Sequence, residues 1–303
     1  MIELYEDNLK DFNKQSSKGN QLKWETDNYW YKSDYAGYEG LSEYVISELL
    51  RYSTLNDKEY ICYTTEAIQY KRQQYLGCKS KNFVPEGWKL MTLERLFQLN
   101  GIDSLYKQIY KIESIEERVH YLVNETIKIT GLNHFGEYLT KMMAIDAFFL
   151  NEDRHMHNIA VLIDDKDKFH YCPYFDHGAA LLSDITMDYP LNESIYDLIK
   201  DVKSKTISND FIEQLDAFEK IYGNKLNFKF NEKDIRNILD RELNYPNEIK
   251  ERVFNILLYQ KNKYQYLFNN WRFNRIFFSF TNYQYIKPNL PKHFINRNNY
   301  VMK

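Results

Sequence analysis

The stretch that decides the fold lies at the centre of the chain and reads Asn151-Glu152-Asp153-Arg154-His155-Met156-His157-Asn158. Two short apolar runs joined by a charged turn follow it, up to residue 174, and predict a β-hairpin. A hairpin brings its second strand back to the end where its first strand began. Asp153, Asn158 and Asp176 are therefore expected at the same end of this hairpin. Their carboxylate and amide oxygens can together hold Mg²⁺.

The composition is that of a folded protein. Of the 303 residues, 44% are hydrophobic, and 27 Tyr and 19 Phe exclude a disordered chain. This length allows one large domain or two lobes, and either can bury a sizeable core. A net charge of -3 and a pI near 6.2 do not suggest a general nucleic-acid binder. A local basic patch is still compatible with these totals.

Three features bear on the cellular compartment. Residues 1–7 are acidic and lack the basic and apolar segments of a secretory signal. No apolar stretch reaches the roughly twenty residues that cross a bilayer. The three cysteines are widely spaced, which favours reduced thiols over a disulfide framework: Cys62, Cys78 and Cys172. We therefore expect a cytoplasmic protein with no membrane partner.

The first part of the chain predicts a second hairpin. Residues 22–26 and 29–32 have the composition of strands, and Asp27-Asn28 between them supplies a tight turn. A loop of small and polar residues precedes the first strand, and its backbone N–H groups can face phosphate oxygens. An ordinary surface turn is the simpler explanation when this loop is considered alone. The candidate phosphate-binding residues in the loop are Ser16, Ser17, Gly19 and Asn20.

Lys32 ends the returning strand, and a helical pattern begins shortly after it. Apolar residues recur at helical spacing over residues 41–49, and Glu43 lies in the first turns of that helix. A strand lysine held by a helix glutamate is the device with which kinases bind the α- and β-phosphates of a nucleotide. Glu39 and Glu48 are rival partners. Considered alone, Lys32 is more simply a solvated lysine at a strand edge.

The rest of the chain predicts a lobe boundary near residue 92. Strand-like segments occur up to residue 83, whereas long helical patterns follow residue 92. We expect helices over residues 114–130, 135–150, 208–222, 232–243 and 246–269. The apolar face of the second of these is expected to be core that holds the loop at 151–158. The fold class is therefore α+β, with an antiparallel-sheet lobe containing one long helix (1–92), a mostly helical lobe (93–281) and a tail (282–303).

The chemistry of these residues points to phosphoryl transfer. That reaction needs one carboxylate to orient or accept the proton of the attacking hydroxyl, and further oxygen ligands to hold Mg²⁺ against the phosphates. Asp153 and Asn158 are five residues apart, as are the Asp and Asn of the kinase catalytic loop. Asp176-His177-Gly178 stands where kinases have Asp-Phe-Gly. The spacing alone is a weak signal, which Lys32 and Glu43 upstream strengthen.

These motifs resemble those of the HipA-like serine/threonine kinases. The resemblance is carried by residues 151–158, by Phe175-Asp176-His177-Gly178, by Lys32 with the helix from Glu43, and by residues 211–216. It covers roughly residues 14–270 and is nearest to the stand-alone members similar to the Helicobacter cell-translocating kinase. It implies a bilobal protein-kinase-like fold.

The resemblance also implies a role for each candidate residue. Asp153 would be the catalytic base, and Asn158 and Asp176 the Mg²⁺ ligands. Lys32 would hold the phosphates, with Glu43 keeping it in place. The cofactors would be ATP and Mg²⁺, and the substrate would be a protein with a Ser or Thr acceptor. Direct nucleic-acid binding is not expected.

The sequence departs from the kinase pattern in two loops. It contains no G-x-G-x-x-G and no His-Arg-Asp order, and only Gly19 marks the phosphate loop. HipA kinases can be regulated by autophosphorylation of a serine in this loop, which makes Ser16 and Ser17 the candidates here. Because HipA acts as a toxin with a DNA-binding partner, an antitoxin-like partner is also conceivable.

Two other functions fit parts of the sequence. Four of the seven histidines lie in one short region and, with the nearby acids, would suit a zinc or di-metal hydrolase: His155, His157, His170 and His177. That alternative leaves Lys32 and Asn158 unexplained, and no H-E-x-x-H pattern is present. The other alternative is a catalytically inactive kinase fold that binds a nucleotide or a protein.

Overall fold

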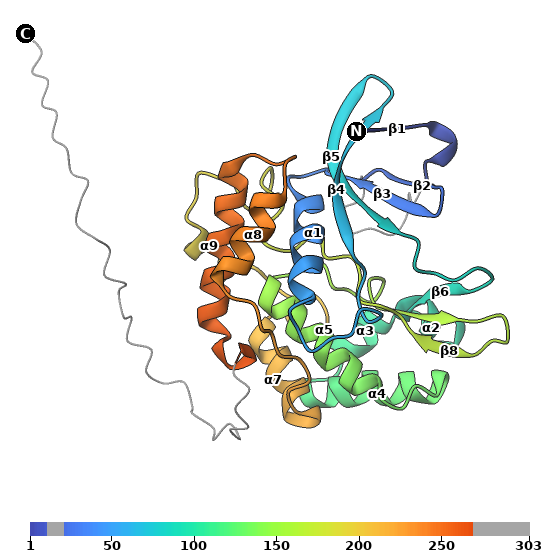
Figure 1. Ribbon diagram of the computed structural model, residues 1–303. Coiled ribbons are helices and arrows are strands. Elements are labelled where there is room, and N and C mark those ends of the chain that lie inside the picture. The colour runs from blue at the N-terminus through green and yellow to red at the C-terminus, as the bar shows by residue number, and fades with distance from the viewer. Residues whose placement is uncertain (11–20, 269–303) are drawn as a thin grey trace, which may run out of the picture. The chain divides into compact units, whose positions relative to one another are not determined.

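The computed structural model describes residues 1–10 and 21–268. The candidate phosphate loop (Ser16, Ser17, Gly19 and Asn20) and the predicted tail from residue 282 lie outside the described residues. Figure 1 shows a curved N-terminal sheet with one long helix beside it, followed by a mostly helical region. The predicted α+β fold class is confirmed.

The N-terminal sheet has five strands in the order β1-β4-β5-β3-β2. Their bounds are β1 Ile2–Leu4, β2 Lys23–Thr26, β3 Tyr29–Ser33, β4 Tyr63–Tyr70 and β5 Gln73–Lys81. The predicted β2–β3 hairpin is present. Asp27 and Asn28 have φ values of 50° and 65°, as the primed turns between two strands require. The sheet was predicted to be antiparallel throughout. It differs from that prediction at one edge, where β1 pairs with β4 in parallel.

One helix, α1 (Glu39–Leu50), packs against this sheet at β4 and β5. Its first turn approaches β5 so closely that a Cβ on Gly40 would lie 2.4 Å from the backbone carbonyl carbon of Gly77. Only a residue without a side chain fits at that distance. Since β5 pairs with β3, the close approach brings α1 to the strand that carries Lys32.

A second sheet has three strands in the order β6-β7-β8. Its strands are β6 Lys89–Thr92, β7 Ala160–Ile163 and β8 Phe169–Tyr171. The β7–β8 pair is the hairpin predicted after residues 151–158, with shorter strands than expected. The unpredicted β6 is antiparallel to β7, which ties the chain before residue 93 to that hairpin.

The remaining helices of the described chain follow β6. They are α2 Leu93–Leu99, α3 Leu105–Tyr110, α4 Ile115–Thr130, α5 Phe135–Phe149, α6 Ile195–Asp201, α7 Phe211–Tyr222, α8 Glu232–Arg241 and α9 Asn247–Lys263. Two 3-10 helices complete the assignment, Glu6–Asn8 and Gln265–Phe268. The five predicted helices are present, although the last one ends at Lys263. The short α3 and α6 were not predicted.

The helix α5 forms the centre of the helical lobe and contacts α4, α7 and α9. Its predicted apolar face is core, with fully buried side chains that include Phe135, Leu139, Ile145 and Phe149. The helix ends at Phe149, and the φ of 60° at Leu150 turns the chain out of the helix and into Asn151. A close-packed helix therefore positions the loop that the sequence singled out.

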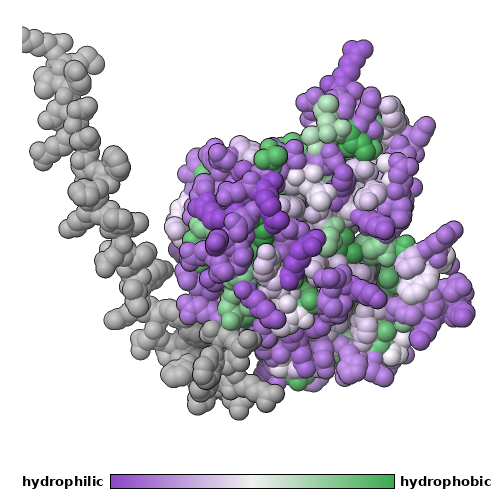
Figure 2. Space-filling view, in the orientation of Figure 1, coloured by the Kyte–Doolittle hydropathy of each residue, from purple (hydrophilic) through white to green (hydrophobic). Residues whose placement is uncertain are grey.

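The surface of the described residues is mostly hydrophilic on the face that Figure 2 shows. None of the helices in residues 1–10 and 21–268 is long and apolar enough to span a membrane. The cysteines are free thiols, as predicted: Cys78 and Cys172 are buried, and Cys62 is exposed.

Candidate active site

Lys32 lies at the centre of a three-membered ion cluster. Its Nζ is 2.7 Å from Oε1 of Glu43 and 2.8 Å from Oδ1 of Asp176. The lysine comes from β3, the glutamate from α1, and the aspartate from the segment after β8. Glu43 is almost fully buried, with a side-chain exposure of 1%, whereas Asp176 keeps 24%. The cluster is thus shielded from water but open on the side of Asp176.

Of the three glutamates that the sequence offered as partners on α1, Glu43 is the one that contacts Lys32. The carboxylate of Glu39 accepts hydrogen bonds from the backbone N–H groups of residues 35–37, just before the helix. Glu48 pairs with two arginines, Arg51 and Arg241. The rotation of α1 about its axis therefore selects a single glutamate for the lysine.

The charges of the cluster favour an ionised Asp176. Burial by itself raises the pKa of Asp176, but the positive charges of Lys32 and then Lys23 bring that pKa well below its ordinary value. Burial also acts against the charged form of Lys32, yet Asp176 and Glu43 raise its pKa well above the ordinary value. In Glu43 the effect of burial prevails over Lys32, and the pKa is raised.

A second lysine, Lys23, had no role in the sequence interpretation. It lies directly opposite Lys32 in the β2–β3 pairing. Side chains of directly opposite residues project from the same face of a sheet. The effect of its charge on the pKa of Asp176 agrees with that placement. The turn at residues 27–28 is the signal that could have found it, because the turn fixes the register of the two strands.

The segment after Asp176 is bound to α1 through the same glutamate. The backbone N–H of His177 donates to Oε2 of Glu43 at 2.8 Å, while Oε1 accepts from Lys32. Asp176 has a φ of 63°, a left-handed conformation that is uncommon for a residue with a side chain. Surrounding contacts therefore hold Asp176 in a backbone conformation that it would not adopt by preference.

Arg154 organises residues 151–158 from the inside. Its side chain is 1% exposed, and its Nε lies 2.9 Å from Oδ2 of Asp146, a fully buried residue of α5. Its Nη1 donates to the backbone oxygens of Asn158 and Phe175 at 2.9 and 2.8 Å. The backbone beside both predicted metal ligands is therefore fixed on one guanidinium. Burial raises the pKa of Asp146, and Arg154 opposes that rise.

Asp153 lies in a tight turn that Asn158 closes. The Nδ2 of Asn158 donates to the backbone oxygen of Asp153 at 2.9 Å, so the amide oxygen is the atom that would bind a metal. The Asp153 side chain is 15% exposed, with Oδ1 lying 3.5 Å from Nζ of Lys205. Its Oδ2 is 3.8 Å from Nε2 of His155. Lys205 follows Asp153 by 52 residues and was not singled out from the sequence.

Several contacts join the loop at residues 151–158 to the segment around Asp176. The Arg154 guanidinium bonds to the backbone of both segments. In addition, Nδ2 of Asn151 donates to the backbone oxygen of Asp176 at 3.4 Å. The pKa of His155 is lowered by burial, and the charges of both Asp153 and Asp176 oppose this effect. The structure thus brings the predicted base, the predicted ligands and Lys32 into one region between the two lobes.

The four histidines of the region lie in three separate places, because the rings of His155 and His157 pack against each other edge to face, with centroids 5.6 Å apart. The Nδ1 of His177 lies 3.2 Å from a guanidinium nitrogen of Arg154, and burial with that positive charge lowers its pKa well below the ordinary value. His170 pairs with Asp164 and stacks on Trp88. Among the described residues, no group of three or more His, Cys, Asp or Glu side chains is arranged to hold a metal. The zinc-hydrolase alternative therefore finds no ligand set in this part of the chain.

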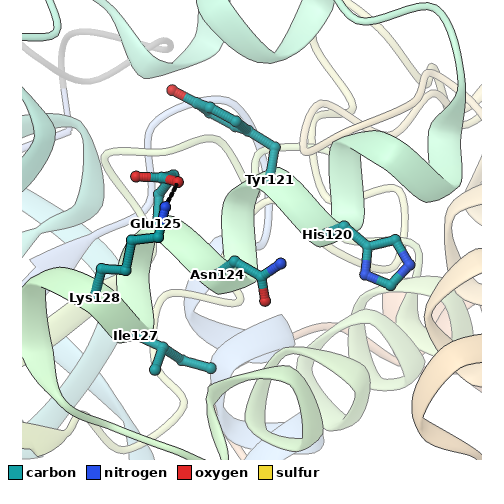
Figure 3. A pocket seen from close by; sticks show the side chains of 6 residues that line it. All are labelled: His120, Tyr121, Asn124, Glu125, Ile127 and Lys128. Atoms are coloured by element: carbon teal, nitrogen blue, oxygen red, sulfur yellow. Dashed lines mark hydrogen bonds and ion pairs between the residues drawn. The ribbon is translucent and has the colours of Figure 1, made fainter.

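Two cavities lie away from this cluster. One, of about 400 Å³, lies on the surface of α4 and is lined by His120, Tyr121, Asn124, Glu125, Ile127 and Lys128 (Figure 3). All six side chains come from one helix, and none of the candidate residues is among them. The other, of about 450 Å³, lies beside the start of α1 and the start of α9.

The sheet with its helix, the strand lysine held by a helix glutamate, and the two aspartate segments below them define a kinase-like fold. The described chain is structurally similar to the proinflammatory kinase CtkA of Helicobacter pylori, with a TM-score of 0.56 and 17% identity. The match covers 86% of this chain and 94% of CtkA. The predicted resemblance to this group of kinases is confirmed at the level of the fold.

A second solved structure has a weaker likeness. It is a chain of the HipA, HipB and operator DNA complex from the toxin–antitoxin system of Shewanella oneidensis MR-1, with a TM-score of 0.45 and 10% identity. The match covers 84% of this chain and 62% of that one. No protein-family model matches the sequence. No curated protein matches it either.

Proposed function

We propose that this chain is an ATP- and Mg²⁺-dependent protein kinase that transfers the γ-phosphate of ATP to a Ser or Thr hydroxyl. The observation that carries the proposal is the cluster in which Lys32 contacts both Glu43 and Asp176, beside a loop that presents Asp153. Phosphoryl transfer depends mainly on positioning and on charges aimed at the phosphates. The cluster supplies both, because its members come from two lobes and meet at fixed hydrogen bonds.

The donor atoms near Asp176 suit Mg²⁺. A carboxylate whose pKa is held low and an amide oxygen are hard oxygen ligands, which this ion prefers over nitrogen or sulfur. Asp176 and Asn158 would hold the ion, and the ion would offset the negative charge of the nucleotide phosphates. Lys32 would bind phosphate oxygens through Nζ, with Glu43 keeping the ammonium in place.

Asp153 would act as the catalytic base. Its carboxylate is partly exposed at the end of a turn that Asn158 closes, so an acceptor hydroxyl can reach it. The carboxylate would orient that hydroxyl and accept its proton as the oxygen attacks the γ-phosphorus. Arg154 is buried beneath the loop and bonded to Asp146, so its part is to hold the loop rather than to bind the phosphates.

Other parts of the proposal concern segments around this cluster. Residues 1–92 would cover the nucleotide, residues 93–281 would carry the catalytic loop and the metal ligands, and residues 282–303 would form a tail. Ser16, Ser17, Gly19 and Asn20 would face the phosphates, and Ser16 or Ser17 would be the site of autophosphorylation. Phosphopeptide mass spectrometry after incubation with ATP tests that site, and two unmodified serines would contradict it.

The reaction itself is tested with γ-labelled ATP and Mg²⁺. We expect the wild-type chain to label itself or a general protein acceptor such as casein, and an Asp153→Ala variant to lose that labelling. Asp165→Ala is the matched control, because Asp165 lies exposed in the turn between β7 and β8. Labelling that persists in Asp153→Ala would contradict the base assignment. Nucleotide binding without any labelling would favour a binding module instead.

A further inference from the structure

The geometry points to Lys205 as a further catalytic residue, a cation that contacts the transferred phosphoryl group beside Asp153. This inference rests on the kinase function proposed above. The Nζ of Lys205 lies 3.5 Å from Oδ1 of Asp153, and the lysine side chain is 41% exposed. An ammonium beside the base that remains open to solvent is placed where the phosphoryl group and the acceptor must meet.

Buried contacts on both sides fix the backbone around Lys205. The hydroxyl of Thr206, which is fully buried, donates to the backbone oxygen of Arg154 at 2.6 Å. The next residue, Ile207, is also fully buried, and its backbone oxygen accepts from Nη1 of Arg118 at 2.8 Å. The segment between α6 and α7 is therefore attached directly to the catalytic loop. These backbone contacts, together with the ion pair to Asp153, hold Lys205 at the catalytic loop.

Two other cations near the loop, Arg154 and Lys32, are engaged by other groups. Arg154 is buried and engaged with Asp146 and two backbone oxygens. Lys32 pairs with Glu43 and Asp176. Lys205 therefore brings a positive charge that is itself partly exposed to solvent next to Asp153.

The role follows from the charge that develops during transfer. The acceptor oxygen forms a bond to the γ-phosphorus, the bond from that phosphorus to the bridging oxygen of ADP breaks, and the hydroxyl proton passes to Asp153. Negative charge is spread over the non-bridging oxygens of the phosphoryl group at that moment. A lysine ammonium has three donors, so Lys205 can bond to such an oxygen while it stays beside Asp153. The ammonium takes no part in the proton transfer and stabilises the transition state by its charge.

The test compares three variants of the full-length chain: Lys205→Met, Lys205→Arg and Lys203→Met. Lys203 is an exposed lysine of the same segment and serves as the matched control. Transfer from labelled ATP to casein or to the chain itself gives kcat and the KM for ATP, and the casein concentration series gives the KM for the acceptor. Binding of a fluorescent ATP analogue with Mg²⁺ gives the nucleotide affinity, and thermal unfolding gives Tm.

We expect Lys205→Met to lower kcat by about 100-fold, the order found when one transition-state donor is removed. The nucleotide affinity and Tm should stay close to those of the wild type, Lys205→Arg should recover part of kcat, and Lys203→Met should match the wild type. If Lys205→Met does not fold, Lys205→Gln takes its place in the same comparison.

Three results would overturn the inference while leaving the kinase proposal in place. A Lys205→Met variant within twofold of the wild-type kcat would remove the role, and so would a loss confined to the KM for the acceptor. A loss of kcat that follows Tm equally in Lys205→Met and Lys203→Met would make the segment merely structural. A wild-type chain that binds nucleotide but transfers no phosphate would instead overturn the kinase proposal, and this inference with it.

Discussion

Two ion pairs of this molecule use the same chemistry in different surroundings. Arg154 and Asp146 are fully enclosed, and the guanidinium is also bonded to the backbone oxygens of Asn158 and Phe175. Lys32 and its carboxylates join segments of both lobes, and Asp176 stays partly exposed. A charge whose partners are all fixed protein atoms holds a structure together. A charge that faces an opening can exchange a carboxylate for a phosphate.

The largest effect is expected from breaking the enclosed pair. An Arg154→Leu variant leaves Asp146 buried without its cation, which typically costs about 3–5 kcal/mol of stability. Urea denaturation followed by circular dichroism measures the change in the free energy of unfolding. The double variant with Asp146→Leu is the control, and it should lose less than the two single variants added together. A loss below about 1 kcal/mol in Arg154→Leu would show that the pair does not hold the loop.

Breaking the partly exposed cluster of Lys32, Glu43 and Asp176 should have the opposite result and lower the activity more than the stability. Removing Lys32 as Lys32→Met takes away one phosphate-binding cation, for which a loss of about 10² to 10³ in kcat is expected. The stability should change little, because Glu43, whose pKa is raised by burial, can take up a proton instead. Lys79→Met, which breaks a strand ion pair with Glu66, is the matched control for both measurements.

If Lys32→Met lowered the free energy of unfolding as much as Arg154→Leu does, the distinction between the two ion pairs would be removed. Retained transfer in Lys32→Met would separate the lysine from the chemistry altogether. The two variants therefore test both halves of the comparison, because Arg154→Leu is expected to change the stability and Lys32→Met is expected to change the activity.

A further carboxylate, that of the half-buried Asp34, extends the comparison to a group that is bonded by neutral donors. Its oxygens accept from the backbone N–H of Gly40 and from the hydroxyl of Tyr245, both at 2.6 Å. Burial, followed by the charge of Glu39, raises the pKa of Asp34 to about 7. Because this folded-state pKa lies above the unfolded one, the folded chain binds more protons between about pH 4 and pH 7. The contribution of Asp34 to stability therefore falls as the pH rises through that window.

An Asp34→Asn variant should remove this part of the pH dependence. The slope from one fully shifted group is about 1.4 kcal/mol per pH unit, which is an upper bound here. Denaturant unfolding of the wild type and the variant at pH 5, 6 and 7 gives the difference directly. Asp165→Asn, in an exposed turn, controls for the loss of one negative charge. Parallel curves for the wild type and Asp34→Asn would contradict a raised pKa.

The local elements were predictable because short-range signals determine them. The Asp27-Asn28 turn sets the register of β2 and β3, and both residues have the positive φ that such a turn requires. Ser114 caps α4 by accepting from the N–H of Glu117, and Gly131 ends that helix at a φ of 72°. In each case the residue type and its spacing carry the physical cause of the structure.

The unpredicted parts depend on contacts between distant segments. The strand β1 has three residues and is defined by its pairing with β4, more than sixty residues away. The helices α3 and α6 are too short to show a period. Lys205 reaches Asp153 only through the folded chain, and no local pattern marks it. Asp146 did leave a signal, because an aspartate inside an apolar helix must find a buried partner.

The smallest activity change is expected from Glu43→Gln, which separates the two functions of that carboxylate. Glutamine keeps an oxygen that can accept from the N–H of His177, so the segment after Asp176 should stay attached to α1. It loses the negative charge that fixes Lys32, and the lysine then has Asp176 as its charged neighbour. We expect kcat to fall by about tenfold, which corresponds to about 1.4 kcal/mol, with Tm unchanged or slightly higher because a buried charge is removed. Glu39→Gln, on the preceding turn of the helix, is the matched control, and equal losses in both variants would show that the charge of Glu43 does not position the lysine.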